Sequence, residues 1–196
     1  MEYPRLYLAF ARETTPPKNL WHTLVRCLVG DMTHMEIAMQ LQEDVIRYTV
    51  FAWRINDRVF RTVSGYDERK NHKWVFLRVP CTKEQLAAIN NTFKDMIAQK
   101  EKFSWWKMAR SASPFPAFGA KGTFCAEVCA RALQAAGMFP TEGHPPEAAT
   151  TLELYQYAQT CLDAYEDENP SRHRAKVVDE LGNVLSQRYE FNDIFP

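Results

Sequence analysis

The sequence predicts an α+β fold, in which a central antiparallel sheet packs against helices. Two observations carry this prediction. Segments rich in β-branched, aromatic and aliphatic residues gather before Pro80, whereas apolar residues recur at helical spacing mainly after it. Strands that precede helices, rather than alternate with them, are typical of α+β proteins. No internal repeat interrupts this order.

Five segments before Pro80 are predicted to be strands. The segment 5–11 (RLYLAFA) is a short apolar run, and 45–55 (VIRYTVFAWRI) is rich in β-branched and aromatic residues. Between them, 32–41 (MTHMEIAMQL) alternates, so its odd- and even-numbered residues face opposite sides of the sheet. A polar turn separates 32–41 from 45–55, which predicts a hairpin. Shorter strands are predicted at 59–63 and 73–79.

Four segments are predicted to be helices: 20–29, 82–100, 124–136, and one from Thr150 or Thr151 to about Ala164. The segment 82–100 carries the clearest signals, because Thr82 and Gln85 fit a capping box and an apolar stripe follows. Gly137 is expected to end the helix 124–136. The aromatic and proline-rich segment 103–121 is predicted to be a packed loop.

The last residues form a separate stretch. An acidic segment ends at Pro170, and the segments 176–178 and 184–191 are predicted to pair as a late hairpin around a Leu-Gly-Asn turn. We therefore expect one domain over residues 1–165. Residues 166–196 are expected to form a C-terminal extension, a β-hairpin packed on the same domain.

Composition excludes several functional classes. The 196 residues carry 24 Lys+Arg and 24 Asp+Glu, so the net charge is zero and polyanionic partners such as nucleic acid are not expected. There is no glycine-rich nucleotide loop, and the first apolar run is too short for a signal peptide or a membrane span. Five cysteines, an odd number, predict free thiols in a reducing compartment, so a cytoplasmic location is expected.

Cys125 is the cysteine whose position suggests chemistry. It opens the alanine-rich helix 124–136, where the helix dipole and unpaired backbone N–H groups lower a thiol pKa and stabilise a developing oxyanion. Glu127, in the first turn, suits the dipole but slightly opposes thiolate formation. Cys129, one turn on, is expected to be a small buried apolar residue, as are the remaining cysteines: Cys27, Cys81 and Cys161.

His34 is the candidate base. It lies within the predicted strand 32–41, with Glu36 two residues on and therefore on the same face. A histidine oriented by a carboxylate is typical of a general base, although an ordinary solvated strand face has the same spacing. A metal site of His34, Glu36, Cys125 and Cys129 lacks CxxC or HExxH spacing. We therefore predict no metal and no cofactor.

Taken together, these segments resemble the circularly permuted branch of the NlpC-like papain-fold cysteine hydrolases. That branch includes YaeF/YiiX-like proteins, poxvirus papain-like relatives and, more distantly, lecithin:retinol acyltransferase. Its pattern is a strand with [ST]H and, much later, [FY]C[SA]E opening an aliphatic helix. Thr33-His34 and Phe124-Cys125-Ala126-Glu127 stand in this order. The resemblance covers residues 6–157; Ala126 replaces a frequent Ser, and the segment 146–155 lacks the second Pro of the family's last helix.

The resemblance implies a papain-like fold and a catalytic site. Cys125 matches the nucleophile and His34 the base. Glu36 is our choice for the third, polar residue because of its same-face spacing, with the neighbouring strand offering three alternatives: Arg47, Tyr48 and Thr49. A viral source fits the resemblance, in which case the location is the host cytoplasm or the virion.

The function implied is that of a thiol hydrolase or acyltransferase acting on a peptide, isopeptide or lipid amide or ester. A catalytically inactive binding module on the same fold is the alternative. The aromatic residues of 103–121, including Trp105 and Trp106, either line one wall of the cleft or pack against the core. Nucleic-acid binding through this basic, aromatic segment is the weakest hypothesis because the chain is neutral.

Overall fold

The structure is a computed structural model, and it describes the chain in several stretches. These are residues 5–13, 23, 32–41, 44–50, 58–62, 72–111, 122–168, 177–178 and 184–185. The predicted helix 20–29 lies outside them apart from Thr23, and so do residues 51–55 of the predicted second strand.

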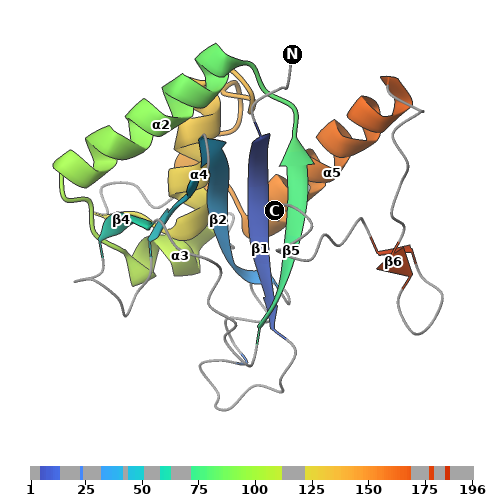
Figure 1. The fold of residues 1–196 in the computed structure, drawn as a ribbon. Helices are drawn as coiled ribbons and strands as arrows, with labels where there is room; N and C mark the ends of the chain where they lie inside the picture. The colour runs from blue at the N-terminus through green and yellow to red at the C-terminus, as the bar shows by residue number, and fades with distance from the viewer. Residues whose placement is uncertain are drawn as a thin grey trace.

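A five-stranded antiparallel sheet forms the centre of the described fold (Figure 1). Its order is β4-β3-β2-β1-β5. The strands are β1 (Arg5–Glu13), β2 (Met32–Leu41), β3 (Asp44–Val50), β4 (Val59–Thr62) and β5 (His72–Val79). The predicted α+β class and the predicted strands are confirmed within the described residues.

The register of β2 decides which side chains face one another. Leu41 pairs with Asp44 across the turn, which confirms the predicted hairpin, and Ile37 pairs with Tyr48. Because directly opposed residues share a face, Tyr48 lies on the Ile37 face and its neighbour Arg47 on the face of Glu36. Against β1, the register shifts next to the pair of Ala11 and His34. Such irregularities re-aim side chains and recur beside functional sites.

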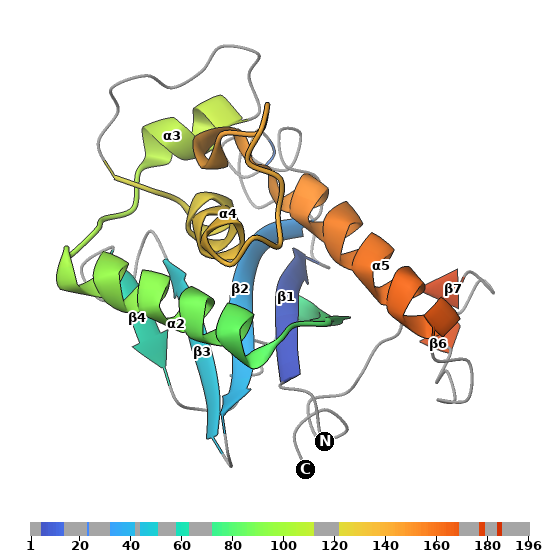
Figure 2. The same ribbon diagram turned by 90° about the horizontal axis from the view of Figure 1, so that it is seen from above.

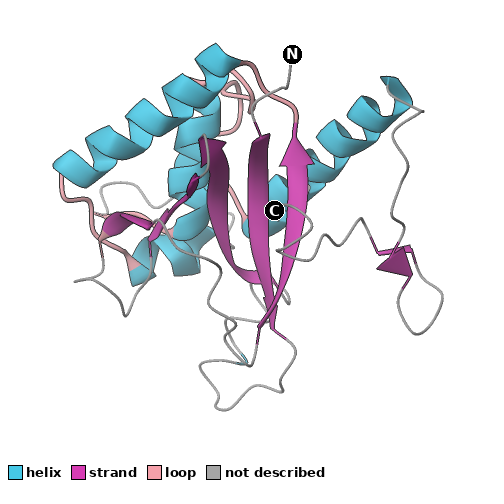
Figure 3. Cartoon of the chain, viewed as in Figure 1, coloured by secondary structure: helices cyan, strands magenta, loops and turns pink. Residues whose placement is uncertain are grey.

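Three long helices pack on one side of the sheet, as Figures 1 and 3 show. They are α2 (Lys83–Ala98), α4 (Cys125–Ala135) and α5 (Thr151–Glu168). The apolar core lies between them and the sheet. Two ring contacts mark it: Tyr48 of β3 stacks on Phe93 of α2 at 4.6 Å, and Phe10 of β1 meets Tyr155 of α5 edge-on at 5.2 Å.

Local sequence signals explain where α2 and α5 begin. The Thr82 hydroxyl accepts a hydrogen bond from the Gln85 N–H at 3.2 Å, and the Gln85 side chain accepts one from the Thr82 N–H at 2.9 Å. This confirms the predicted capping box. Thr150 and Glu153 repeat the arrangement before α5, which runs beyond the predicted Ala164 to Glu168.

The prediction of a loop over 103–121 is wrong for its first part. Trp105–Ser111 forms a short helix, α3, and the Ser104 hydroxyl accepts a hydrogen bond from the Lys107 N–H at 3.3 Å. Serine is a strong N-cap residue, so Ser104 begins a helix here despite the aromatic residues and prolines that follow. Residues 112–121 lie outside the described stretches.

Two small elements complete the description. A 3-10 turn, η2 (Pro146–Ala148), precedes α5. Near the C-terminus, β6 (Val177–Val178) pairs antiparallel with β7 (Val184–Leu185), as predicted for the late hairpin. Its packing on residues 1–165, and that boundary itself, remain predictions. No described helix combines the length and apolar character that crossing a membrane requires.

Candidate active site

Cys125 is the first residue of α4, as the sequence predicted. Its sulfur lies at the N-terminus of the helix, and the residue is 5% exposed. The chain before it is anchored from both sides, because the Thr123 carbonyl accepts from the Ser104 N–H at 2.6 Å and the Thr123 N–H donates to the Lys102 carbonyl at 2.7 Å. These two hydrogen bonds hold the chain just before α4 against residues 102–104.

Gly122 allows the chain before α4 to lie this close to Lys102. Its φ is +91°, and a Cβ at this position would lie 2.7 Å from the Lys102 carbonyl oxygen. Only glycine adopts such a conformation without strain and tolerates backbone at that distance. Gly122 thus brings the strand-like segment around Phe103 against Thr123, two residues before the nucleophile candidate.

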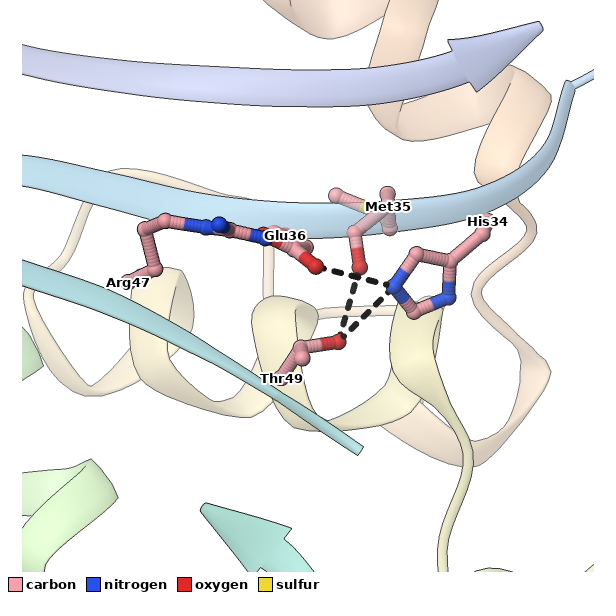
Figure 4. Close-up of polar contacts among 5 residues, drawn as sticks. All are labelled: His34, Met35, Glu36, Arg47 and Thr49. Atoms are coloured by element: carbon pink, nitrogen blue, oxygen red, sulfur yellow. Dashed lines mark hydrogen bonds and ion pairs between the residues drawn. The ribbon is translucent and has the colours of Figure 1, made fainter. Parts of the chain in front are cut away.

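His34 and Glu36 lie together, which confirms their predicted same-face placement (Figure 4). His34 Nε2 is 3.4 Å from Glu36 Oε1. The Glu36 side chain has no exposed surface, and that of His34 is 12% exposed. The alternative of an ordinary solvated strand face is therefore wrong for this site.

Thr49 is the second partner of the imidazole. Its hydroxyl oxygen lies 3.2 Å from His34 Nε2 and donates its proton to the Met35 carbonyl at 3.1 Å. A hydroxyl that has donated its proton, and a carboxylate, are both acceptors, so both require the proton to sit on Nε2. In Figure 4 the other ring nitrogen, Nδ1, points away from Glu36 and Thr49. The neutral ring therefore presents the Nδ1 lone pair on that side.

Arg47 holds the other end of the Glu36 carboxylate. Its Nε and Nη2 each lie 2.8 Å from Glu36 Oε2, and its side chain is 10% exposed. The Glu36 carboxylate thus spans two partners, with Oε1 toward His34 and Oε2 toward Arg47. Burial, the largest influence, raises the pKa of Glu36, but the hydrogen bond and charge of His34 and the charge of Arg47 lower it overall.

Tyr48 does not join this cluster. Its hydroxyl donates to Asn90 Oδ1 of α2 at 2.6 Å, and its ring stacks on Phe93. Among the three alternatives to Glu36 on the neighbouring strand, Thr49 contacts His34 directly and Arg47 contacts it through Glu36. Tyr48 faces the helical core.

The electrostatics of Cys125 and His34 favour an ion pair. Burial, the largest influence, opposes it for both groups. Their mutual hydrogen bond and charges outweigh burial, lowering the pKa of the Cys125 thiol and raising the pKa of His34 to about 9. Glu36 adds to the rise for His34, and backbone hydrogen bonds of Met35 and Ala126 add to the fall for Cys125. A lowered pKa makes the thiol easier to deprotonate, and the thiolate is the nucleophilic form of cysteine.

The other described cysteines behave as buried apolar residues. Burial raises the pKa of Cys81 to about 11 and raises those of Cys129 and Cys161 as well. Cys125 is the one of the four described cysteines with a lowered thiol pKa. Cys27 lies outside the described residues. Among the four described cysteines, Cys125 is therefore the one expected to react as a nucleophile.

Glu127 pairs with Lys107, a partner that no sequence pattern indicated. Glu127 is 4% exposed, and Lys107 of α3 donates to its Oε1 at 2.8 Å. Burial nevertheless raises the pKa of the Glu127 carboxyl. The pair fastens α3 to the first turn of α4. Since the two residues lie on separate helices, no local spacing signals their contact.

Within the described stretches, no group of three or more His, Cys, Asp and Glu side chains is arranged to hold a metal ion. Comparison with known proteins adds no assignment: no family model, curated protein or solved structure matches the chain. The chemistry of the cluster therefore has to be argued from its own geometry.

Proposed function

We propose that the chain is a papain-like thiol hydrolase or acyltransferase that acts on an amide or an ester through Cys125, His34 and Glu36. The observation that carries the proposal is the contact of a helix-N-terminal thiol with a buried, carboxylate-oriented imidazole. The thiol pKa is lowered and the imidazole pKa is raised to about 9. Nucleophilic catalysis requires a nucleophile, a base close to it and a group that orients the base.

The reaction would begin with the thiolate. The Cys125 sulfur attacks the carbonyl carbon of the substrate, and its proton resides on His34 Nδ1. The tetrahedral oxyanion would lie near the first N–H groups of α4, which have no acceptor within the helix. Collapse breaks the carbon–nitrogen or carbon–oxygen bond, and His34 returns the proton to the leaving amine or alcohol. A thioester on Cys125 remains.

A second nucleophile would resolve the thioester. His34, neutral again, takes a proton from water or from an acceptor amine, whose oxygen or nitrogen attacks the thioester carbonyl. The carbon–sulfur bond breaks and the thiolate–imidazolium pair is restored. Water makes the protein a hydrolase, and an amine makes it an acyltransferase.

Glu36 and Thr49 would fix the tautomer that this cycle needs. By accepting from Nε2–H, both leave Nδ1 to exchange the proton with sulfur. Glu36 also stabilises the imidazolium that forms, and Arg47 keeps the carboxylate ionised and aimed. We therefore take Glu36 as the third residue, assisted by Thr49.

A thiol-directed activity probe tests the proposal. A chloroacetamide or vinyl sulfone probe should label Cys125, and His34→Ala should slow labelling at neutral pH to the rate of an ordinary cysteine. Cys129→Ala is the matched control and should label as the unaltered chain does, because Cys129 is buried with a raised pKa. Labelling that is absent, or indifferent to His34, would leave the inactive binding module as the better account.

A further inference from the structure

The backbone pairing between β2 and β3 ends beside the candidate active site. The last pair of this ladder is Ile37 with Tyr48. The next residues in the same register, Glu36 and Thr49, both belong to the described stretches but do not pair. Each strand stays in the sheet on its other side, β2 paired with β1 and β3 paired with β4. Figure 4 shows β2 and β3 moving apart here. Backbone groups of β2 that face β3 beyond the ladder therefore need other partners.

Met35 is the residue of β2 whose backbone faces the point where pairing has ended. Its carbonyl accepts a hydrogen bond from the Thr49 hydroxyl of β3 at 3.1 Å (Figure 4). The N–H and the carbonyl of a strand residue point to the same side of the strand, so the Met35 N–H also faces β3. Met39, four residues on, faces the same way and lies opposite Ile46 within the ladder.

The Met35 N–H meets the Cys125 sulfur. Helix α4 packs against both β2 and β3, and Figure 2 shows it beside them. Burial, the largest influence, raises the pKa of the Cys125 thiol, and the hydrogen bond and charge of His34 lower it. Backbone hydrogen bonds of Met35 and Ala126 lower it further, which places both N–H groups at the sulfur.

Burial makes this contact matter for the chemistry of the thiol. Met35 has no exposed surface, so its N–H has to find its acceptor inside the protein. A thiol is a weak acceptor, whereas a hydrogen bond to a charged acceptor is strong. A buried N–H whose acceptor is the Cys125 sulfur therefore favours the thiolate over the thiol.

We propose that the main-chain N–H of Met35, left without a β3 partner by the end of the ladder, is a catalytic group that holds the Cys125 thiolate. The proposal rests on the function proposed above and adds to it a donor from the sheet. The thiolate is then held by one N–H of the sheet and, through Ala126, by one N–H of the helix. Consecutive residues of β2 thus serve the nucleophile, His34 as its base and Met35 as its donor.

Replacing single amide linkages by esters tests the proposal on the full chain. The α-hydroxy acid analogue of methionine, incorporated in place of Met35 by nonsense suppression, removes the N–H and keeps the side chain. The pH midpoint of Cys125 alkylation should rise by about one to two units. The alkylation rate at neutral pH should fall about 10- to 100-fold, the range for loss of a hydrogen bond to a charged group.

The same ester in place of Met39 is the matched control. Met39 lies in the same strand, is as fully buried as Met35, and its N–H faces Ile46 within the ladder. Both esters remove one buried backbone donor, so both should lower the free energy of unfolding. The alkylation midpoint should move with the Met35 ester and stay in place with the Met39 ester.

Hydrogen exchange gives a second reading that needs no altered backbone, and it decides the question if the Met35 ester does not fold. In a chain carrying isotope-labelled methionine, Cys125→Ala should make the Met35 amide exchange faster, because its N–H loses its acceptor. The Met39 amide, bonded within the ladder, should exchange as it does in the unaltered chain.

A Met35 ester with the alkylation midpoint of the unaltered chain would overturn the proposal, as would unchanged exchange of the Met35 amide in Cys125→Ala. If Cys125 labelling still depended on His34 in either case, the proposed function would stand without this donor. A Cys125 that no thiol probe labels would overturn both.

Discussion

Glu36 Oε1 lies 3.4 Å from His34 Nε2, and the carboxylate that makes this contact has no exposed surface. A buried carboxylate is costly unless it is paired, and here both oxygens are engaged, one by His34 and the other by Arg47. The arrangement links a buried guanidinium to the candidate nucleophile through one carboxylate and one imidazole.

Glu36→Gln tests the orienting carboxylate. The amide keeps the shape but loses the charge, so the imidazolium loses stabilisation and the pKa of His34 falls toward its ordinary value. Because a hydrogen bond to a charged group contributes about 1.5–3 kcal/mol, the rate of Cys125 labelling at neutral pH should fall roughly 10- to 100-fold. The measurement is the second-order rate with a thiol probe. An unchanged rate would remove Glu36 from the site.

Thr49→Val and Thr49→Ser form a matched pair. Valine removes the hydroxyl that accepts from His34 Nε2, and serine retains it. A neutral hydrogen bond contributes about 1 kcal/mol, so labelling by Thr49→Val should slow about fivefold and Thr49→Ser should restore most of the rate. Equal rates for the two variants would mean that the hydroxyl has no part in orienting the ring.

Tyr48→Phe separates the core from the site. The variant loses the hydrogen bond to Asn90 Oδ1 at 2.6 Å, which should lower the free energy of unfolding by about 1 kcal/mol. Labelling of Cys125 should not change, because the hydroxyl faces α2 and not His34. Denaturant unfolding and probe kinetics on the same sample check both halves of the prediction. Slower labelling with unchanged stability would contradict the placement of Tyr48.

Lys107→Met tests the fastening of α3. It leaves the buried Glu127 carboxylate without its ion-pair partner, and breaking such a pair costs about 3–5 kcal/mol when the remaining charge is fully buried. Lys107 is 15% exposed, so we expect the lower end of this range. The double variant Lys107→Met, Glu127→Gln should recover much of the loss in thermal unfolding. No recovery would show that the pair does not act as a unit.

Sequence patterns predicted correctly those features that depend on contacts between residues close together in the sequence. The two-residue period of a strand placed His34 and Glu36 on one face, and the start of an alanine-rich run placed Cys125 at a helix N-terminus. The capping box at Thr82 fixed the beginning of α2 for the same reason.

The same patterns could not predict contacts between segments that are far apart in the sequence. Thr49 meets His34 across the sheet, and no spacing within either segment distinguishes Thr49 from Tyr48 or Arg47 until the register of β2 and β3 is known. Helix α3 was missed because its cap, Ser104, stands among aromatic residues and before prolines, whose signals favour a loop.

The pH dependence of Cys125 alkylation shows whether Cys125 and His34 form a thiolate–imidazolium pair. The pKa of the thiol is lowered, so at each pH below the ordinary pKa of cysteine, about 8.5, Cys125 should be alkylated faster than an ordinary cysteine. Turnover of an amide or ester should then fall as pH rises through about 9, because the imidazolium that protonates the leaving group is lost there.

In His34→Ala the thiol loses its partner, and burial alone should move the alkylation midpoint to or above the ordinary range for cysteine. The alkylation midpoint of the unaltered chain should therefore lie below that of His34→Ala. Coincident alkylation profiles for the two proteins would contradict the thiolate–imidazolium pair on which the account rests.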